Sequence, residues 1–142
     1  MWLKPCIILL LIVCACGENY FDGPIENHYE NGRLMSKISY KNGYPHGPSE
    51  TYHQNGQLRS KGTFEMGQVT GVEESYYENG QLWSKSSYKE GKRHGPDEYY
   101  DIYGELRWRG SYDMGRQCGK WFDDGNIETH PKCPLFSRGF QK

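Results

Sequence analysis

The chain has few aliphatic residues outside its first fifteen positions, because leucine, isoleucine, valine and methionine are scarce in the remainder. Tyrosine (12) and glycine (18) are instead abundant among the 142 residues. This composition excludes a thick aliphatic core and favours a thin sheet built from aromatic residues and glycine. The length allows one domain and leaves no room for two separate cores.

The chain also lacks a strong charge of either sign. Its formal net charge is −1, and removing the first fifteen residues, which include Lys4, changes this to −2. Proteins that bind nucleic acid through its phosphates carry a clear excess of lysine and arginine. The charge balance therefore predicts that the partner is not a nucleic acid.

Known catalytic motifs are missing as well. The sequence has no Gly-x-Ser-x-Gly, no His-Glu-x-x-His and no phosphate-binding loop. No nucleophile, base and orienting group can be assembled from its residues. We therefore predict that the protein is not an enzyme and uses no cofactor.

One apolar run is present, the ten residues from Cys6 to Ala15, which follow a short positively charged start. A bilayer span needs about 20 apolar residues, so this run is typical of a signal peptide and predicts export. The end of the run, Val13 to Gly17, resembles a bacterial lipobox, in which the cysteine after a small residue is acylated. The resemblance predicts fatty acyl chains such as palmitate on Cys16. The alternative is an ordinary secretory leader, cut after Ala15 or Gly17.

Acylation of Cys16 would anchor the mature chain to a membrane, since each buried methylene contributes ~0.8 kcal/mol. Gly17, the residue after this cysteine, resembles that of lipoproteins sorted to an outer membrane. These residues predict a lipid-anchored protein of the cell envelope, at the outer membrane or the surface rather than the inner membrane. Without acylation, the leader predicts a secreted or periplasmic protein.

Glycines recur every 24 residues through the rest of the chain, as the differences 56 − 32 and 80 − 56 show. A fixed period of this size marks a repeat architecture. There are three such series: Gly32, Gly56, Gly80 and Gly104; Gly23, Gly47, Gly71, Gly95 and Gly119; and Gly43, Gly67, Gly91 and Gly115. The blocks are 23–46, 47–70, 71–94 and 95–118, and a shortened fifth from Gly119 predicts a truncated closing hairpin.

Each block contains two short runs rich in Tyr, Ser, Thr and Leu, separated by a turn signal. The signal is Asn-Gly at 31–32, 55–56 and 79–80, and Tyr-Gly at 103–104. Asn-Gly predicts a hairpin with a type I′ turn, which needs positive φ at both central residues. The other connection, such as residues 41–48 with two glycines and two prolines, predicts a longer loop.

A hairpin closed at Asn-Gly places a glutamate opposite a cation in every full block. The predicted pairs are Glu26 with Lys37, Glu50 with Lys61, Glu74 with Lys85, and Glu98 with Arg109. Opposed residues in an antiparallel ladder interact by roughly 0.2 to 1 kcal/mol, and a helix gives no reason for this pattern. The predicted fold class is therefore all-β, a single-layer antiparallel meander of stacked β-hairpin repeats preceded by a signal helix.

Side chains alternate between the two faces of a sheet. One face should be apolar and carry Leu34, Leu58, Leu82 and Leu106 with Tyr29, Tyr40, Phe64, Tyr77, Tyr88, Tyr99, Trp108 and Tyr112. The other should carry the charge pairs and a predicted binding surface, in which tyrosines oppose Arg or Trp: Tyr52, Arg59, Tyr76, Trp83, Tyr100 and Arg107. These residue types are enriched at binding hot spots. The alternative is that they only cover a bare single-layer sheet.

Two cysteines lie outside the leader, Cys118 and Cys133, with 14 residues between them. In an exported protein they can pair, and a bridge would stabilise the fold by ~3 kcal/mol. His46 and His94 recur two blocks apart, near 19 Å at ~4.8 Å per strand, which is too far for a shared metal ion. The predicted domains are a signal peptide (1–15), a tether (16–22), a repeat domain (23–130) and an irregular C-terminal cap (131–142), without a metal site.

The blocks share the pattern Tyr-x-x-Asn-Gly-x-Leu, then Tyr-x-x-Gly and a further glycine, as at Tyr76 to Leu82, Tyr88 to Gly91 and Gly95. This pattern resembles the MORN repeat variant family over Gly23 to Ile127, although Tyr103 stands where Asn is expected. The resemblance implies stacked hairpins in a single layer and brings no catalytic residues. Many bacterial members of this family look like those labelled antitoxins of toxin-antitoxin systems, and others are lipoproteins. Eukaryotic relatives in the wider MORN class are similar in being regarded as scaffolds or lipid-proximal modules.

The combined prediction is an exported, lipid-anchored repeat protein that acts as a protein-binding module. An antitoxin or immunity role is implied by the resemblance alone, and an exported protein would not meet a cytosolic toxin. The alternative is a structural or membrane-proximal, lipid-binding scaffold at the cell envelope, which the lack of a net basic face disfavours. The expected partners are a protein, whose identity stays open, and the membrane through Cys16.

Overall fold

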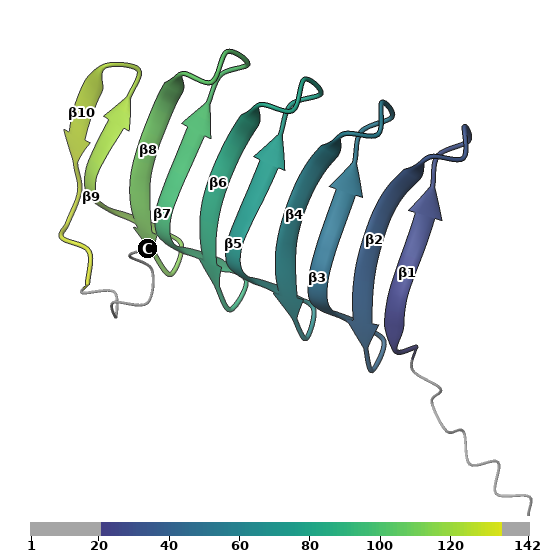
Figure 1. Cartoon of the computed structure of the whole chain (residues 1–142). Helices are drawn as coiled ribbons and strands as arrows, with labels where there is room; N and C mark the ends of the chain where they lie inside the picture. Colours follow the sequence, from purple (N-terminus) through teal and green to yellow (C-terminus); the bar gives the residue numbers. More distant parts are fainter. Residues whose placement is uncertain (1–20, 135–142) are drawn as a thin grey trace, which may run out of the picture.

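The protein is a ten-stranded antiparallel sheet in which every strand pairs with its neighbours in the chain (Figure 1). The structure is a computed structural model and describes residues 21–134. The strands are β1 (Gly23–His28), β2 (Leu34–Lys41), β3 (Tyr44–Tyr52), β4 (Leu58–Glu65), β5 (Gln68–Tyr76), β6 (Leu82–Lys89), β7 (Lys92–Tyr100), β8 (Leu106–Asp113), β9 (Arg116–Asp123) and β10 (Asn126–Thr129). The predicted all-β, single-layer meander is confirmed.

Several predictions concern parts of the chain that lie outside the described residues. These are the signal helix, the acylation of Cys16 and the end of the cap, residues 135–142. Within residues 21–134, no segment forms a helix with the length and apolarity needed to cross a bilayer.

The register confirms the four predicted charge pairs, from Glu26 opposite Lys37 to Glu98 opposite Arg109. The pairing also continues between hairpins, because each lysine of one block faces the glutamate of the next, as Lys61 faces Glu74. The result is one row of alternating charges across β1 to β8, here named the charge row: Glu26, Lys37, Glu50, Lys61, Glu74, Lys85, Glu98 and Arg109.

The predicted type I′ turn at Asn-Gly is wrong. Only the glycine has positive φ (79° at Gly32), whereas Asn31 does not. The amide of Gly32 donates to the carbonyl of Tyr29 (2.9 Å), and the amide of Tyr29 donates to the carbonyl of Arg33 (2.8 Å). This is a type I turn followed by a glycine bulge. The Asn31 side chain supports this turn by accepting a hydrogen bond from the amide of Arg33 (3.0 Å). We call the four connections of this kind the tip turns.

Two-residue turns occur instead at the opposite end of the hairpins, where a longer loop was predicted. Both turn residues have positive φ, as type I′ requires: Asn42-Gly43, Met66-Gly67, Glu90-Gly91 and Met114-Gly115. Asp124-Gly125, between β9 and β10, has the same conformation but lies at the tip end. Lys41 pairs directly with Tyr44, so the residues after the turn already belong to β3. The prediction of a long loop over residues 41–48 is therefore wrong.

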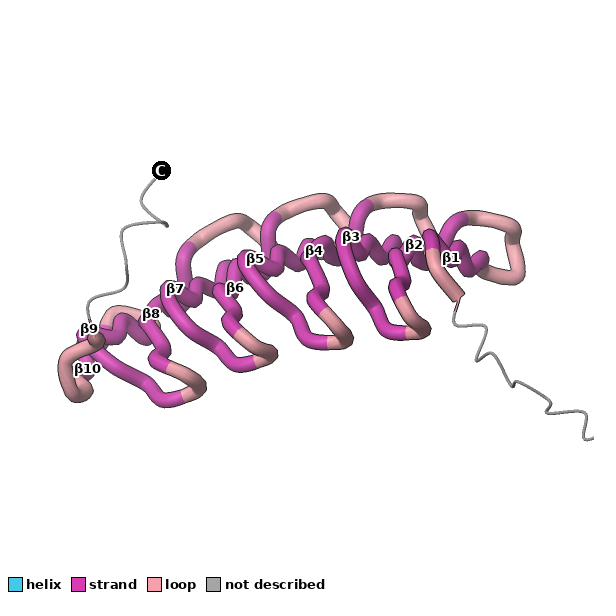
Figure 2. Tube along the Cα trace, turned by 90° about the horizontal axis from the view of Figure 1, so that it is seen from below, coloured by secondary structure: helices cyan, strands magenta, loops and turns pink. Residues whose placement is uncertain are grey.

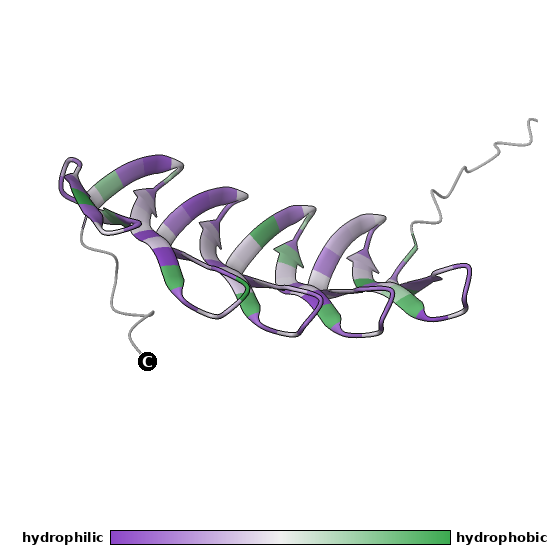
Figure 3. Ribbon diagram, turned by 90° about the horizontal axis from the view of Figure 1, so that it is seen from above, coloured by the Kyte–Doolittle hydropathy of each residue, from purple (hydrophilic) through white to green (hydrophobic). Residues whose placement is uncertain are grey.

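Glycines with positive φ also lie inside the odd-numbered strands, as at Gly47 (97°) and Gly95 (109°). Pairing is irregular beside them, as expected of glycines inside strands. Figure 2 and Figure 3 show that the strands are bent and not straight. Arg93 and Tyr99 would lie about 20 Å apart in a straight strand. The Arg93 guanidinium nevertheless donates to the Tyr99 hydroxyl at 2.8 Å, so β7 bends toward the face that carries both. We call this face the inner face, and the face of the charge row the outer face.

The inner face near β7 buries a polar cluster. Asp97 is 1% exposed; it accepts a hydrogen bond from the Ser86 hydroxyl (2.6 Å) and lies 3.2 Å from the Arg93 guanidinium. Burial raises the pKa of Asp97 above its ordinary value, against the opposing effects of Ser86 and Arg93. The cluster joins the two arms of the bent strand, because Arg93 and Asp97 lie on opposite sides of Gly95.

Aromatic rings fill the inner face from β7 to β9. Trp108 lies between Tyr99 (ring centroids 4.6 Å apart) and Trp121 (4.9 Å), and Trp121 is 6% exposed. The Trp121 indole donates to the carbonyl of Cys118 (3.0 Å). A disulfide joins Cys118 to Cys133 and holds the segment after β10 against β9. The short hairpin of β9 and β10 closes the array, as the truncated fifth block predicts.

Gly110 is required by the Trp121 ring. A Cβ at this position would overlap the indole of Trp121, whereas a Cβ at Gly62, the same position two blocks earlier, would meet Glu73 Cγ at an ordinary 3.6 Å. We predict that Gly110→Ala lowers the free energy of unfolding by about 2 kcal/mol because it overpacks the core. Gly62→Ala is the matched control and should change it by less than about 0.5 kcal/mol. Urea denaturation measures both, and equal losses in the two variants would contradict this packing.

Candidate functional site

An irregularity in each hairpin re-aims one side chain beside the tip turn. In the third hairpin Ser75 faces Ser84 and Tyr76 faces Leu82, so that Trp83 has no opposite residue. Such a β-bulge breaks the alternation of side chains between faces. The same skip recurs in every block, and the bulge residues are Met35, Arg59, Trp83 and Arg107.

The bulge divides the predicted binding surface between the two faces. The Trp83 ring lies against Tyr77 and Tyr99 on the inner face, with ring centroids 6.2 and 6.1 Å apart. The three tyrosines remain on the outer face, where each hydroxyl donates to a glutamate of the charge row: Tyr52 to Glu50, Tyr76 to Glu74, and Tyr100 to Glu98. The predicted opposition of these tyrosines to Arg59, Trp83 and Arg107 is wrong, because it assumed regular alternation up to the turn.

The leucine series changes face for the same reason. Leu34, Leu58, Leu82 and Leu106 were expected on the apolar face, but they pair with His28, Tyr52, Tyr76 and Tyr100. Directly opposed residues of an antiparallel pair share a face, so the leucines lie with the tyrosines on the outer face. The inner face is therefore richer in polar groups than the sequence predicts.

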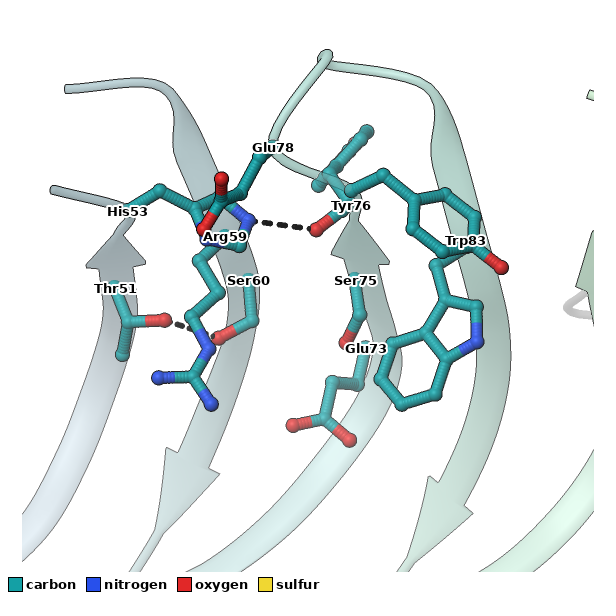
Figure 4. A pocket seen from close by; sticks show the side chains of 10 residues that line it. Thr51, His53, Arg59, Ser60, Glu73, Ser75, Tyr76, Glu78 and Trp83 are labelled. Carbon is teal, nitrogen blue, oxygen red and sulfur yellow. Dashed lines mark hydrogen bonds and ion pairs between the residues drawn. The ribbon is translucent and has the colours of Figure 1, made fainter. Parts of the chain in front are cut away.

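A groove of about 660 Å³ opens on the inner face from β3 to β6 (Figure 4). Its floor consists of small hydroxyl side chains, and the Thr51 and Ser60 hydroxyls share a hydrogen bond of 2.7 Å. Larger side chains rise around this floor, and Figure 4 shows that those of Arg59, Glu73 and Trp83 project to the same side. Trp83 is 46% exposed, so a ligand in the groove can reach its indole.

Two opposite charges of the groove have no partner. Within residues 21–134, neither the Arg59 guanidinium nor the Glu73 carboxylate forms an ion pair or a side-chain hydrogen bond. The charges nearby are paired: Glu74 contacts Lys61 (2.8 Å) and Lys85 (3.1 Å) on the outer face. Arg59 and Glu73 are thus available to groups of opposite charge on a ligand.

Hydrogen bonds between neighbouring repeats hold the tip end of the groove. His53 Nε2 lies 2.9 Å from the carbonyl of Tyr76, and the Asn55 amide donates to the carbonyl of Glu78 at 2.7 Å. The Tyr77 hydroxyl makes the next connection, to the carbonyl of Tyr100 (3.0 Å). These bonds fix the distance between adjacent hairpins, so the wall of the groove is built before a ligand arrives.

The remaining bulge residue of the predicted surface, Arg107, is neutralised. Its guanidinium contacts Asp101 (2.7 Å) and Asp124 (3.1 Å) beside the fourth tip turn. Of the six predicted residues, Arg59, Tyr76 and Trp83 line the groove. The Tyr76 hydroxyl is bound to Glu74, so only Arg59 and Trp83 present functional groups that no described residue engages. Within the described part of the chain, no three His, Cys, Asp or Glu side chains are grouped as a metal site would require.

The sequence analysis missed Glu73 and the hydroxyl floor of the groove. One signal for Glu73 was available in Gly62, which lies inside β4 and belongs to none of the three periodic glycine series. A glycine inside a strand often marks a close approach. The Glu73 side chain indeed occupies the space beside Gly62.

Hairpins that repeat along one sheet, bend at glycines and carry a groove on one face define a β-hairpin repeat protein. Three consecutive segments, residues 21–42, 45–66 and 69–90, match the family model described as MORN repeat variant. The segments begin 24 residues apart (45 − 21 and 69 − 45), which is the period of the hairpins. The structure continues the same hairpin in β7 and β8, beyond the matched segments.

No curated protein matches the sequence. Among solved structures, the chain is similar to one titled "Crystal structure of accessory secretory protein 1,2 and 3 in Streptococcus pneumoniae", with 20% identity and a TM-score of 0.37. The similarity covers 68% of this chain but only 18% of the other. It is too weak to carry a functional argument.

Glu74 should make the stability of the sheet depend on pH. The hydrogen bond from Lys61, aided by Tyr76 and Lys85, lowers the pKa of Glu74 from 4.5 to about 2. A lowered pKa means that the carboxylate stabilises the fold above pH 4.5 and loses this effect as the pH falls toward 2. We predict that Glu74→Gln costs about 2 kcal/mol at pH 7 and that the difference from wild type vanishes by pH 2.

Urea denaturation at pH 7, 4.5, 3 and 2 measures this dependence. Glu30→Gln, at the exposed first tip turn, is the control and should follow the wild type at every pH. A Glu74→Gln deficit that stays constant down to pH 2 would show that the carboxylate is not held by its lysines.

Proposed function

We propose that this protein is an exported, lipid-anchored repeat protein that binds a partner protein through the inner-face groove. The observation that carries the proposal is the pair of free charges, Arg59 and Glu73, beside the half-exposed indole of Trp83. On the outer face, by contrast, Glu74 is neutralised by Lys61 and Lys85. Free charges beside an exposed aromatic ring on a rigid wall are the features of a recognition site.

The groove chemistry fits an extended polypeptide segment. Arg59 would bind a carboxylate, Glu73 would bind a lysine or arginine, and the Trp83 indole would pack against an apolar or aromatic side chain. The hydroxyl floor would accept and donate hydrogen bonds with a peptide backbone. A volume of about 660 Å³ accommodates a few side chains, which suits an anchor within a larger interface along the repeats.

Binding rather than catalysis is the activity that the groove residues favour. The one histidine of the groove, His53, has its Nε2 engaged with the carbonyl of Tyr76. The Ser60 hydroxyl is hydrogen-bonded to Thr51 and not to a base. A nucleophile activated by a neighbouring base is therefore not assembled there.

Under this proposal, the leader would direct the protein to the cell envelope, where it would bind its partner. Acylated Cys16 would anchor the chain at the outer membrane or surface, and a short tether would connect it to β1. By resemblance to antitoxin-labelled relatives, the partner could be a toxic protein met outside the cytosol, which would give the protein an immunity role. The alternative is a structural, membrane-proximal scaffold, a function that would depend on the self-neutralised outer face rather than on the groove.

Substitutions in the groove should abolish partner binding without unfolding the sheet. We expect Trp83→Ala and Arg59→Glu each to weaken capture of a partner from envelope extract by about 30-fold, the cost of losing a hot-spot residue. Met35→Ala is the matched control, since Met35 holds the same bulge position outside the groove.

Quantitative pull-down with the purified protein measures the effect, and urea denaturation checks that each variant is folded. Equal capture by wild type, Trp83→Ala and Arg59→Glu would rule out the groove as the binding site. Binding to phospholipid vesicles alone, without any protein partner, would favour the scaffold.

Acylation is tested by the mass of the mature N-terminus. We expect cleavage before Cys16 and a mass increase that corresponds to two or three acyl chains, and Cys16→Ser should abolish both. Mass spectrometry of the intact protein from membranes gives the answer. An unmodified N-terminus at Cys16 or Glu18 would instead identify an ordinary secretory leader.

A further inference from the structure

The two ends of the sheet differ. β1 (Gly23–His28) pairs only with β2, and among residues 21–134 no strand lies on its other side. At the opposite end, β10 also pairs only with β9, but it has four residues, and the chain after it stays alongside β9. There the amide of Gly119 donates to the carbonyl of Pro131 (2.8 Å), and the Cys118–Cys133 disulfide fixes the segment. An edge strand with unpaired backbone groups is a template for another strand.

The repeat itself defines which strand would fit β1. In the full hairpins, the strands equivalent to β1 are β3, β5 and β7, and each pairs on this side with the second strand of the previous hairpin. In every case the pairing places a lysine opposite the glutamate of the charge row, as Lys37 faces Glu50 and Lys61 faces Glu74. Continuing the period by one strand places a cation opposite Glu26.

In the register, Glu26 faces a cation on one side only, whereas every interior glutamate of the row faces a cation on each side. Glu74 contacts two lysines, at 2.8 and 3.1 Å, whereas Glu26 contacts Lys37 alone, at 3.0 Å. The segment 21–32 also contains Asp22 and Glu30 and has no lysine or arginine. The open edge is therefore acidic along its length and complementary to a basic strand.

A second copy of this chain does not satisfy that requirement. Pairing β1 with β1 of another copy would bring two acidic edges together. Pairing β1 with β10 would place Ile127 in the charge row, because Ile127 faces Phe122 and Phe122 faces Arg109. Neither arrangement supplies a cation opposite Glu26.

We propose that β1 is a strand-addition site for a partner protein that contributes an antiparallel strand with a lysine or arginine opposite Glu26. The added strand would complete backbone pairing along Gly23–His28 and extend the charge row by one cation. Main-chain hydrogen bonds supply affinity in such complexes, and alternate side chains supply specificity. This site is separate from the groove, whose residues begin at β3.

A synthetic peptide with the sequence of residues 80–91 serves as the probe, because β6 is one of the strands that occupies this side in the array. It is titrated against the full chain, and amide hydrogen exchange locates the contact. We expect slower exchange in residues 23–28 and no change in the groove strands. A peptide in which the lysine that corresponds to Lys85 is replaced by glutamate should bind at least about threefold more weakly.

Variants of the protein make the test specific. Glu26→Lys should reverse the preference between the two peptides, and Glu26→Gln should remove it; the second variant retains the fold if the first does not. Glu98→Gln, in the same row but seven strands into the sheet, is the matched control and should bind both peptides as wild type does.

Three results would overturn the assignment. They are no peptide binding at millimolar concentration, protection confined to the groove, or a preference that Glu26→Gln leaves unchanged. Self-association of the full chain through β1, seen by sedimentation and exchange, would assign this edge to a second copy instead of a basic partner strand.

Discussion

The bend at the glycines inside the odd-numbered strands is the constraint on which the rest of the structure depends. A single-layer sheet has no second layer to bury its side chains, and the bend supplies one by bringing the two arms of the same strand together. Arg93 can reach Asp97 and Tyr99 only for this reason. Gly95 has a left-handed backbone conformation, which glycine adopts at little cost in free energy because it has no Cβ. The inner face, its aromatic core and its groove all follow from that conformation.

The inner face then differs from block to block although the backbone is the same. One position, repeated every 24 residues, is occupied by Ile25, Ser49, Glu73, Asp97 and Trp121. Near the C-terminal end the position is filled by a ring and by a buried carboxylate, which stabilise the fold. In the middle it holds the free Glu73 of the groove. The charge row on the outer face is regular from block to block, whereas the inner positions vary.

The sequence predicts the strand pairing well because the numbers of paired residues in a hairpin sum to a constant. The glutamate and lysine positions have the same parity in every block, and Glu74 and Lys85 meet as expected. The predicted turn type was wrong because Asn-Gly suits both a type I′ turn and a type I turn followed by a glycine bulge. Here the Asn79 side chain supports the second type by accepting a hydrogen bond from the amide of Gln81. The bulge at Trp83 leaves no local mark in the sequence, since a skipped residue changes neither composition nor period. The groove depends on that bulge, so it could not be placed beforehand.

The two ends of the array differ, because a disulfide fixes the segment after β10 and nothing comparable is described at β1. Each hairpin contacts only its neighbours in the sheet, and the disulfide with the Trp121 core terminates one side. Duplication of one 24-residue segment would therefore lengthen the molecule by a hairpin while every other contact stayed in place. In evolutionary terms, the length of the inner face can change by whole periods while the disulfide-fixed end of the sheet stays as it is.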